Sequence, residues 1–237
     1  MWLKRLLVSA SFLILFSSAS AEASFVYQPS PQKARGVTLV VHGLNLKPSK
    51  MQELADQLTS MNQDVVLVTL AGHGEDEKEF GEVTRERWLH DVFEAYEAAT
   101  LKAKAQGVPV QFLGFSVGGL LGVDLVASGK AQFAKMVLLA PALRVHARSR
   151  LIRLCRIFGR SFVIRSRAPK DYRAHIGTTV AAYESLFESL ESLENSNLSL
   201  ANVPTLVFMD KGDELVSYSK IESFISEKQL TNWKLEL

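Results

Sequence analysis

Uninterrupted apolar runs recur along the chain and predict a parallel sheet. Each run is short and rich in aliphatic residues, and polar or glycine-containing segments separate it from the next. Such runs are typical of strands that are buried on both faces, because helices cover a parallel sheet on both sides. The predicted strands are 36–41, 64–70, 108–112, 134–140, 203–209 and 233–237.

Helix-forming segments lie between these runs. The longest is predicted to begin after Thr84, a capping residue, and to end near Gln106, with Gly107 as its stop. Shorter helices are predicted at 48–60, 120–127 and 217–227. Strands that alternate with helices predict an α/β fold with a mostly parallel sheet and helices on both faces.

One region interrupts the alternation. From Leu143 to Asn202 the sequence has helix-like segments but no clear buried strand, which predicts a helical cap at about 144–202 inserted into a core of 22–143 and 203–237. Residues 144–173 contain ten Arg or Lys and one acidic residue, interleaved with large apolar residues. A basic amphipathic stretch of this kind can lie on an anionic membrane. We favour the alternative of a lid whose apolar side covers the active site and whose arginines face water.

The first 21 residues have the features of a signal peptide. A basic start, 1–5, precedes an apolar segment of 11 residues, 6–16, and Ala19-Ser20-Ala21 supplies a small-x-small cleavage pattern. The apolar segment is shorter than the roughly 20 residues of a membrane-spanning helix. An uncleaved N-terminal anchor is the alternative. We expect an exported protein, periplasmic or secreted, that begins at Glu22.

Composition and spacing narrow the chemistry. The 237 residues suffice for one sizeable domain, and the net charge of +2 indicates no particular partner. Cys155 is the only cysteine, so no intramolecular disulfide can form. The histidines and acids lack metal-binding spacings, and 114–119 lacks the lysine of a phosphate-binding loop and the dinucleotide-binding glycine pattern. We therefore expect no metal, no cofactor and no nucleic-acid partner.

Gly114-Phe115-Ser116-Val117-Gly118 is the strongest chemical motif in the chain. It joins a predicted strand to a predicted helix and has the G-x-S-x-G pattern of a nucleophile elbow. The flanking residues are glycine because Cβ atoms there would clash with neighbouring backbone. The turn exposes the serine hydroxyl, and the Val117 N–H at the helix start can face a developing oxyanion. A glycine turn that merely contains a serine is the alternative.

The order of several motifs resembles the α/β-hydrolase fold, and within it the carboxylesterase and monoacylglycerol lipase group. These motifs are His42-Gly43, Gly72-His73-Gly74, the elbow, the cap and Gly212-Asp213, and the resemblance runs from about Ala34 to the last residue.

The resemblance assigns roles to individual residues. It implies that Ser116 is a nucleophile that forms an acyl-enzyme. The N–H groups of Leu44 and Val117 would form the oxyanion hole, and His42 and Gly43 would shape the substrate-binding loop. Asp213 would orient the catalytic histidine, although Asp210 and Glu214 are its neighbours.

The sequence departs from that group at the general base. The triad order in this fold is Ser, acid, His, with the histidine after the last strand. The five histidines are His42, His73, His90, His146 and His175, and none follows Asp213. The printed sequence reaches Leu237 inside the predicted last strand and without a final helix. Either it is a truncated version of a longer enzyme or it lacks the base, and full activity is not expected from Ser116 alone.

Two functions fit these observations. The first is an exported serine ester hydrolase that acts on small acyl esters or monoacylglycerol-like lipids. The second is a non-catalytic protein of the same fold that binds an acyl or lipid ligand or an anionic membrane surface. Peptidase, thioesterase, lactonase and perhydrolase activities are not separable from esterase activity by these motifs, since the shape of the pocket decides among them.

Overall fold

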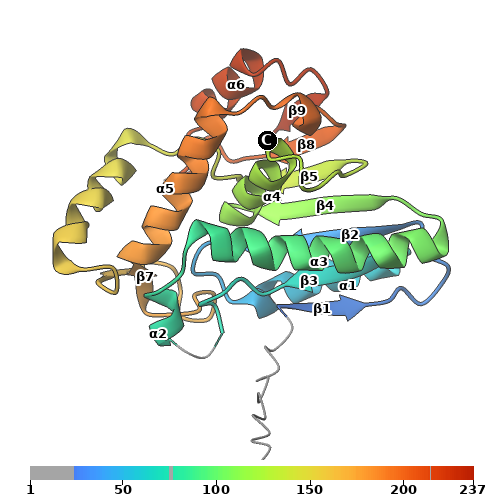
Figure 1. Ribbon diagram of the computed structural model, residues 1–237, viewed down its shortest axis with the longest axis horizontal. Coiled ribbons are helices and arrows are strands. Elements are labelled where there is room, and N and C mark those ends of the chain that lie inside the picture. Colours follow the sequence, from blue (N-terminus) through green and yellow to red (C-terminus); the bar gives the residue numbers. More distant parts are fainter. Residues whose placement is uncertain (1–23, 75–76, 214) are drawn as a thin grey trace, which may run out of the picture.

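A seven-stranded sheet forms the centre of the molecule (Figure 1). The computed structural model describes residues 24–74, 77–213 and 215–237, so the predicted signal peptide lies outside the described residues. The strand order is β1-β3-β2-β4-β5-β8-β9, and every neighbouring pair is parallel except β1 with β3. The strands of this sheet are β1 (Phe25–Gln28), β2 (Gly36–Val41), β3 (Gln63–Val68), β4 (Val110–Phe115), β5 (Met136–Leu139), β8 (Thr205–Phe208) and β9 (Trp233–Glu236).

The mostly parallel α/β fold expected from the sequence is confirmed. Each of the six predicted strands is present, with ends shifted by at most three residues. The strand β1 was not predicted from the sequence. This strand lies at the sheet edge and is only partly buried, so the sequence has no continuous apolar run there.

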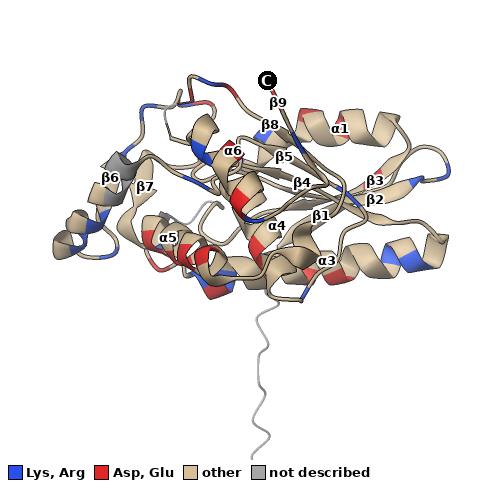
Figure 2. Cartoon of the chain, turned by 90° about the horizontal axis from the view of Figure 1, so that it is seen from above, with Lys and Arg blue, Asp and Glu red and all other residues tan. Residues whose placement is uncertain are grey.

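Helices cover both faces of the sheet (Figure 2). On one face, α1 (Gln52–Ser60) packs against β3, while α3 (Arg85–Gln106) and α4 (Val117–Ala127) pack on the opposite face. The remaining helices are η1 (Pro48–Met51), α2 (Glu77–Phe80), η2 (Ala147–Phe158), α5 (Val180–Asn195), η3 (Ser199–Ala201) and α6 (Tyr218–Glu227). Among the described helices, none is long and apolar enough to cross a membrane.

The predicted ends of α3 are confirmed. The Thr84 hydroxyl accepts a hydrogen bond from the Arg87 N–H at 3.1 Å, as a capping residue does. Gly107 follows the last turn with a φ of 67°, a left-handed conformation in which glycine carries no Cβ penalty.

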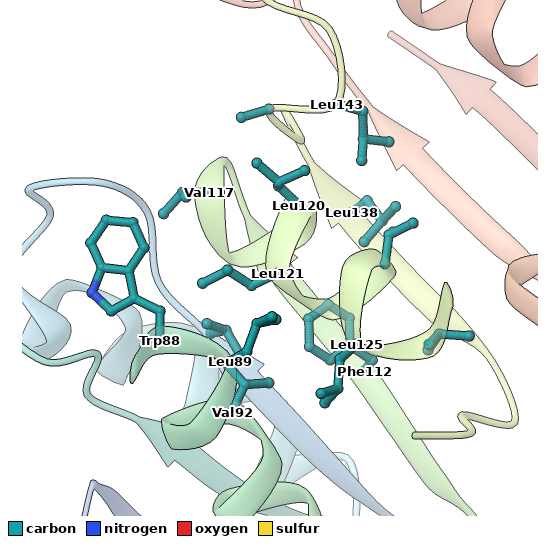
Figure 3. Packing of buried hydrophobic residues seen from close by; sticks show 14 of the residues in the cluster. Trp88, Leu89, Val92, Phe112, Val117, Leu120, Leu121, Leu125, Leu138 and Leu143 are labelled. Atoms are coloured by element: carbon teal, nitrogen blue, oxygen red, sulfur yellow. The ribbon is translucent and has the colours of Figure 1, made fainter. Parts of the chain in front are cut away.

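The main hydrophobic core lies between the sheet and the layer of α3 and α4 (Figure 3). Trp88 of α3, Leu121 of α4 and Phe112 of β4 are all buried in this cluster, and Phe112 lies beside Leu125. The Trp88 indole Nε1–H donates to the Ala71 carbonyl at 3.0 Å, so its polar atom is satisfied inside the core. This core fixes the direction in which α4 leaves the sheet.

On the α1 face, the far end of the sheet is less covered. Leu206 and Phe208 of β8 point away from the main core, and each is 39% exposed. Val207 between them is fully buried on the opposite face. On this face α1 belongs to a cluster with residues of β2, β3 and β4, and neither Leu206 nor Phe208 of β8 is part of a hydrophobic cluster of the described residues.

The region predicted as a helical cap divides into two parts. Its second part, α5, packs against α4 and α3 and contributes Leu186, Leu190 and Leu193 to the main core. Its first part contains η2 and a two-stranded antiparallel sheet of β6 (Val163–Arg165) and β7 (Gly177–Thr179). The expectation of helix alone is therefore wrong for this part. Strands of three residues are too short to leave a pattern in the sequence.

The orientation of η2 differs from the favoured lid arrangement. Leu151, Leu154 and Ile157 are 65%, 68% and 83% exposed. Arg153 and Arg156 pair with acids of α5, Arg153 with Glu191 and Arg156 with Glu184 at 3.1 Å, and their own side chains are 45% and 76% exposed. Figure 2 shows acidic positions along α5, and basic positions in the neighbouring segment that precedes β6. η2 thus contacts α5 through exposed ion pairs and packs Ile152 against the main core, while other apolar side chains of η2 are in water.

Candidate active site

The residues singled out from the sequence lie at one edge of the sheet. Ser116 follows β4, the Gly43–Leu44 loop follows β2, and Asp213 follows β8. These three strands are parallel, so their carboxyl ends meet at the same edge. The topology therefore brings together segments that are far apart in the sequence.

Ser116 occupies a strained turn between β4 and α4. Its φ of 50° and ψ of −113° lie in a region that residues with a side chain rarely adopt. The surrounding backbone holds it there: the Ser116 N–H donates to the Leu139 carbonyl at 2.9 Å. The Ser116 carbonyl accepts from the N–H groups of Leu120 at 3.2 Å and Ala142 at 3.0 Å. The turn sets the half-buried hydroxyl at the amino end of α4.

The glycines of the elbow are required by close backbone packing, as the sequence analysis expected. A Cβ atom on Gly114 would come 2.6 Å from the Gly119 backbone. A Cβ atom on Gly118 would come 2.3 Å from the Val41 carbonyl oxygen and 2.6 Å from that of His42. The start of α4 therefore lies directly against the end of β2.

The loop after β2 lies beside Ser116. A Cβ atom on Gly43 would come 3.3 Å from the Ser116 Cβ and 2.6 Å from the Phe115 ring. Within the described residues, no acceptor hydrogen-bonds to the N–H of Leu44 or of Val117, whereas the N–H of Asn45 is bonded. Two backbone donors are thus available near the hydroxyl, which is the composition of an oxyanion hole.

His42 fixes the peptide that carries the Leu44 N–H. Its Nδ1–H donates to the Gly43 carbonyl at 2.9 Å, while its Nε2 accepts from the Leu70 N–H at 3.1 Å. Full burial lowers the pKa of His42 to about 4, so the ring is neutral and can accept this bond. His42 therefore holds the loop and does not face the reacting atoms.

His73 and Asn45 complete the support of the loop. The His73 Nε2 accepts from the Asn45 N–H at 3.0 Å, and its ring lies 4.6 Å from that of His42. Burial, and then the neighbouring His42, lower the pKa of His73 well below its ordinary value. The sequence analysis did not single out Asn45. Its one signal is that asparagine tolerates a left-handed backbone, here with a φ of 53°.

Asp213 lies in the turn after β8. Its Oδ1 accepts from the N–H groups of Leu215 at 2.8 Å and Val216 at 2.7 Å. These bonds hold the half-buried carboxylate in place. Asp210 instead is exposed and caps the turn through the Gly212 N–H at 2.7 Å. Glu214, the other acidic neighbour, lies outside the described residues.

A backbone link connects the Asp213 turn with the Ser116 turn. The segment that begins at Ala142, which is bonded to Ser116, continues to a β-bridge between Val145 and Val216. The His146 N–H also donates to the Leu215 carbonyl at 3.1 Å. The Ser116 turn and the Asp213 turn are therefore parts of one hydrogen-bonded framework.

The histidines of the described residues do not complete a triad. None of them hydrogen-bonds to the Ser116 hydroxyl or the Asp213 carboxylate. His42, His73 and His175 are buried and bonded to backbone groups, and His90 pairs with Glu94 on the surface of α3. His146 donates from Nε2 to the Asp213 main-chain carbonyl at 3.3 Å. In the same residues, no group of three or more His, Cys, Asp or Glu side chains is placed to hold a metal ion.

The fold and this edge of the sheet define a protein of the α/β-hydrolase class. The sequence profile of the family described as serine aminopeptidase, S33, matches residues 32–175, which is more than half of the chain. The chain therefore belongs to this hydrolase family. No curated protein sequence matches it.

Solved structures similar to this one include lipases and esterases. A soluble variant of monoglyceride lipase from Saccharomyces cerevisiae, in complex with a substrate analogue, has a TM-score of 0.77 at 17% identity, over 90% of this chain and 81% of that one. The monoacylglycerol lipase of Paleococcus ferrophilus has a TM-score of 0.70 at 16% identity, over 91% and 88%. A thermostable carboxyl esterase from Bacillus coagulans has a TM-score of 0.64 at 13% identity, over 90% and 84%. At these identities the likeness concerns the fold.

Proposed function

We propose that this protein is an exported serine hydrolase that cleaves carboxylic esters of small acyl groups or monoacylglycerol-like lipids. The observation that carries the proposal is the position of Ser116 at a strained elbow beside the N–H groups of Leu44 and Val117, which have no hydrogen-bond acceptor among the described residues. Lipases and esterases among the similar structures support the substrate class.

The reaction would proceed through an acyl-enzyme. The Ser116 Oγ attacks the ester carbonyl carbon, and the carbonyl oxygen becomes an oxyanion that accepts from Leu44 and Val117 N–H. The bond to the alcohol then breaks, and the alcohol leaves with the proton that Ser116 lost. Water attacks the acyl-enzyme, releases the carboxylic acid and restores the hydroxyl. None of the described histidines, as placed, bonds to Ser116 or Asp213, so the group that moves these protons is a base other than these, and Asp213 would orient it.

The test is ester hydrolysis by the intact protein from its native source, with p-nitrophenyl butyrate and a monoacylglycerol as substrates. We expect Ser116→Ala to lower kcat/KM by about a thousandfold or more. Ser128→Ala is the matched control, because the Ser128 hydroxyl only bonds the Leu125 carbonyl at the end of the same helix. Equal activity of wild type and Ser116→Ala would contradict the proposal.

Amide hydrolysis is tested alongside, because the family carries an aminopeptidase name. The same acyl-enzyme chemistry applies to an aminoacyl p-nitroanilide, so Ser116 would serve in both reactions. We expect kcat/KM for the ester to exceed that for the anilide. A higher kcat/KM for the anilide than for the ester would leave the role of Ser116 standing but would overturn the proposed substrate class.

Export is tested by the mature N-terminus. Cleavage after Ala21 predicts a protein that begins at Glu22 and is found in the periplasm or the medium. An N-terminus at Met1 together with membrane attachment would favour the uncleaved anchor. Intact mass from the same preparation also shows which residues the natural product contains beyond the described ones.

The exposed face of η2 favours a second candidate function, docking on an anionic lipid surface. Leu154, Ile157 and Phe158 are each more than 60% exposed on this short segment. Arg165 and Lys170 follow η2 in the sequence and are exposed, and neither has an ion-pair partner in the part of the chain that the structure describes. Exposed apolar side chains in a segment that also carries Arg and Lys residues fit a negatively charged lipid–water interface. Docking on a lipid surface is compatible with ester hydrolysis and can also be a function without it.

Vesicle sedimentation tests the docking. We expect binding to phosphatidylglycerol-containing vesicles that weakens with salt, and weak binding to phosphatidylcholine alone. Ile157→Ser should weaken binding at least fivefold. Leu101→Ser is the matched control, since Leu101 is 69% exposed but lies on α3. Equal binding by the two variants, or no binding at low salt, would overturn the docking surface.

A further inference from the structure

The cap contacts the loop beside Ser116 through a short antiparallel pairing. The Lys47 N–H donates to the Tyr172 carbonyl at 2.8 Å, and the Ala174 N–H donates to the Asn45 carbonyl at 2.9 Å. A β-bridge between Leu46 and Arg173 lies between these two bonds. The stretch that leaves Leu44 therefore runs alongside the cap stretch that leads into β7.

Asn45 joins the two stretches with its side chain as well. Its Oδ1 accepts from the His175 N–H at 2.8 Å, and its Nδ2 donates to the His175 carbonyl at 3.3 Å. With the bond from its N–H to His73 and the bond from Ala174 to its carbonyl, all four polar groups of Asn45 are engaged. The side chain is only 5% exposed, so each lost bond would leave a buried polar group unpaired.

His175 extends the connection to a third segment. Its Nε2–H donates to the Gly72 carbonyl at 2.7 Å, and its ring lies 5.1 Å from that of Phe80. Gly72 precedes His73, which accepts from the Asn45 N–H. The cap, the turn after β3 and the loop after β2 are thus linked in a closed circuit of hydrogen bonds centred on Asn45.

The consequence falls on the two peptide groups that flank Leu44. His42 binds the carbonyl of the Gly43–Leu44 peptide, and in a planar trans peptide this fixes the opposite direction of the Leu44 N–H. The next peptide is fixed by the bond from Asn45 N–H to His73. The left-handed φ of 53° at Asn45 turns the chain from this loop toward the cap.

We propose that Asn45 is a positioning residue that couples the cap to the oxyanion hole: its side-chain bonds to His175 hold the loop in the conformation that presents the Leu44 N–H to Ser116. A cap that moved away from the loop would take His175 with it and release this restraint. The role in catalysis rests on the proposed hydrolase function, whereas the coupling between cap and loop does not.

The test compares two asparagine-to-glycine variants. Asn45→Gly keeps access to the left-handed φ and removes only the side-chain bonds. Asn62→Gly is the matched control, because Asn62 has a φ of 61° at the end of α1, away from the loop. Asn45→Asp is the conservative variant, since it retains an acceptor for the His175 N–H.

Hydrogen exchange measures the coupling between the cap and the loop after β2, and this measurement does not require enzymatic activity. We expect Asn45→Gly to raise the exchange rates of the Ala174 and His175 amides tenfold or more, with α3 and α4 unchanged. Asn62→Gly should leave the cap amides as in wild type. Equal cap exchange in both variants would overturn the coupling, even if the protein hydrolyses no ester.

Steady-state kinetics test the positioning role proposed for Asn45. We expect Asn45→Gly to lower kcat tenfold or more with KM within twofold, because the oxyanion forms in the transition state. Asn45→Asp should recover part of kcat. A rise in KM with kcat unchanged, or a loss equal in Asn62→Gly, would overturn the role of Asn45. If wild type has no activity that depends on Ser116, the proposed function fails, and the exchange experiment alone decides the coupling.

Discussion

Gly118, in the first turn of α4, lies against Val41 at the end of β2, where a Cβ atom would come 2.3 Å from the carbonyl oxygen. Backbone cannot move aside as the end of a flexible side chain can, so Gly118→Ala should separate α4 from β2. We expect it to lower the free energy of unfolding by about 3 kcal/mol. Gly74→Ala, at a site with open space, is the control. Equal urea midpoints for both variants would contradict the packing argument.

The strain at Ser116 predicts that the serine proposed for catalysis lowers the stability of the folded protein. A side chain at a φ of 50° and ψ of −113° costs on the order of 1–3 kcal/mol, and glycine removes that cost but gains freedom in the unfolded chain. We therefore expect Ser116→Gly to be more stable than wild type by roughly 1 kcal/mol in urea unfolding. Ser116→Ala keeps a Cβ atom and should gain less than Ser116→Gly. A Ser116→Gly variant less stable than Ser116→Ala would show that the turn is unstrained.

The buried histidines predict loss of stability in acid. The pKa of His42 falls from 6.5 to about 4 on folding because of burial, and that of His73 also falls. Between these values the unfolded chain binds more protons than the folded one, so their contribution to stability is complete above pH 6.5 and is lost as the pH falls toward 4. Urea unfolding measured at intervals from pH 7.5 to 4.5 checks this trend.

Asp91 acts in the opposite direction and supplies a sharper test. Burial raises the pKa of Asp91 from 3.8 to about 6, so in this range the folded state binds the extra proton and Asp91 favours folding as the pH falls. We expect Asp91→Asn to lose stability more steeply than wild type between pH 6 and 4.5. An equal or shallower slope would contradict this assignment.

A buried ion pair ties α3 to α4. The Arg85 guanidinium donates to both carboxylate oxygens of Asp124, at 2.9 and 2.8 Å, and Asp124 is 1% exposed. Arg85→Met leaves that charge with the Ser192 hydroxyl as its remaining side-chain partner, so we expect a loss of about 3 kcal/mol or more. Adding Asp124→Asn should restore part of the loss.

Lys234→Met is the comparison for that ion pair. Lys234 pairs with Glu236 at the surface and is mostly exposed, so its removal should cost less than about 1 kcal/mol. Thermal unfolding ranks the stabilities of Arg85→Met, of Arg85→Met combined with Asp124→Asn, and of Lys234→Met. If Arg85→Met lost no more than Lys234→Met, the buried pair would not be a structural connection.

The strands were predictable because a strand buried on both faces leaves a local signal. Residues 36–41 of β2 are all buried, and the predicted and observed bounds agree. The same holds for α3, whose capping residue Thr84 and terminal Gly107 act within a few residues of the chain. The elbow glycines could be named as a pair, because the steric demand of that turn is also local.

The cap was less predictable because its arrangement depends on distant partners. The sequence showed arginines interleaved with apolar residues, but not which of them would find an acid. Glu184 and Glu191 on α5 pair with Arg156 and Arg153 of η2, while Leu154 and Ile157 are exposed. β1 escaped notice for a related reason, since its stability comes from pairing with β3 more than from its own composition.

The sequence by itself determined the class of fold, the elbow around Ser116 and the order of motifs along the chain, because periodicity, caps and glycine sterics act over a few residues. Only the tertiary structure decided that Asn45 and His175, separated by 130 positions, share two hydrogen bonds beside the candidate oxyanion donors. It also decided which face of η2 meets water. Both outcomes depend on burial and pairing between segments that are distant in the sequence, and local sequence patterns do not encode such pairing.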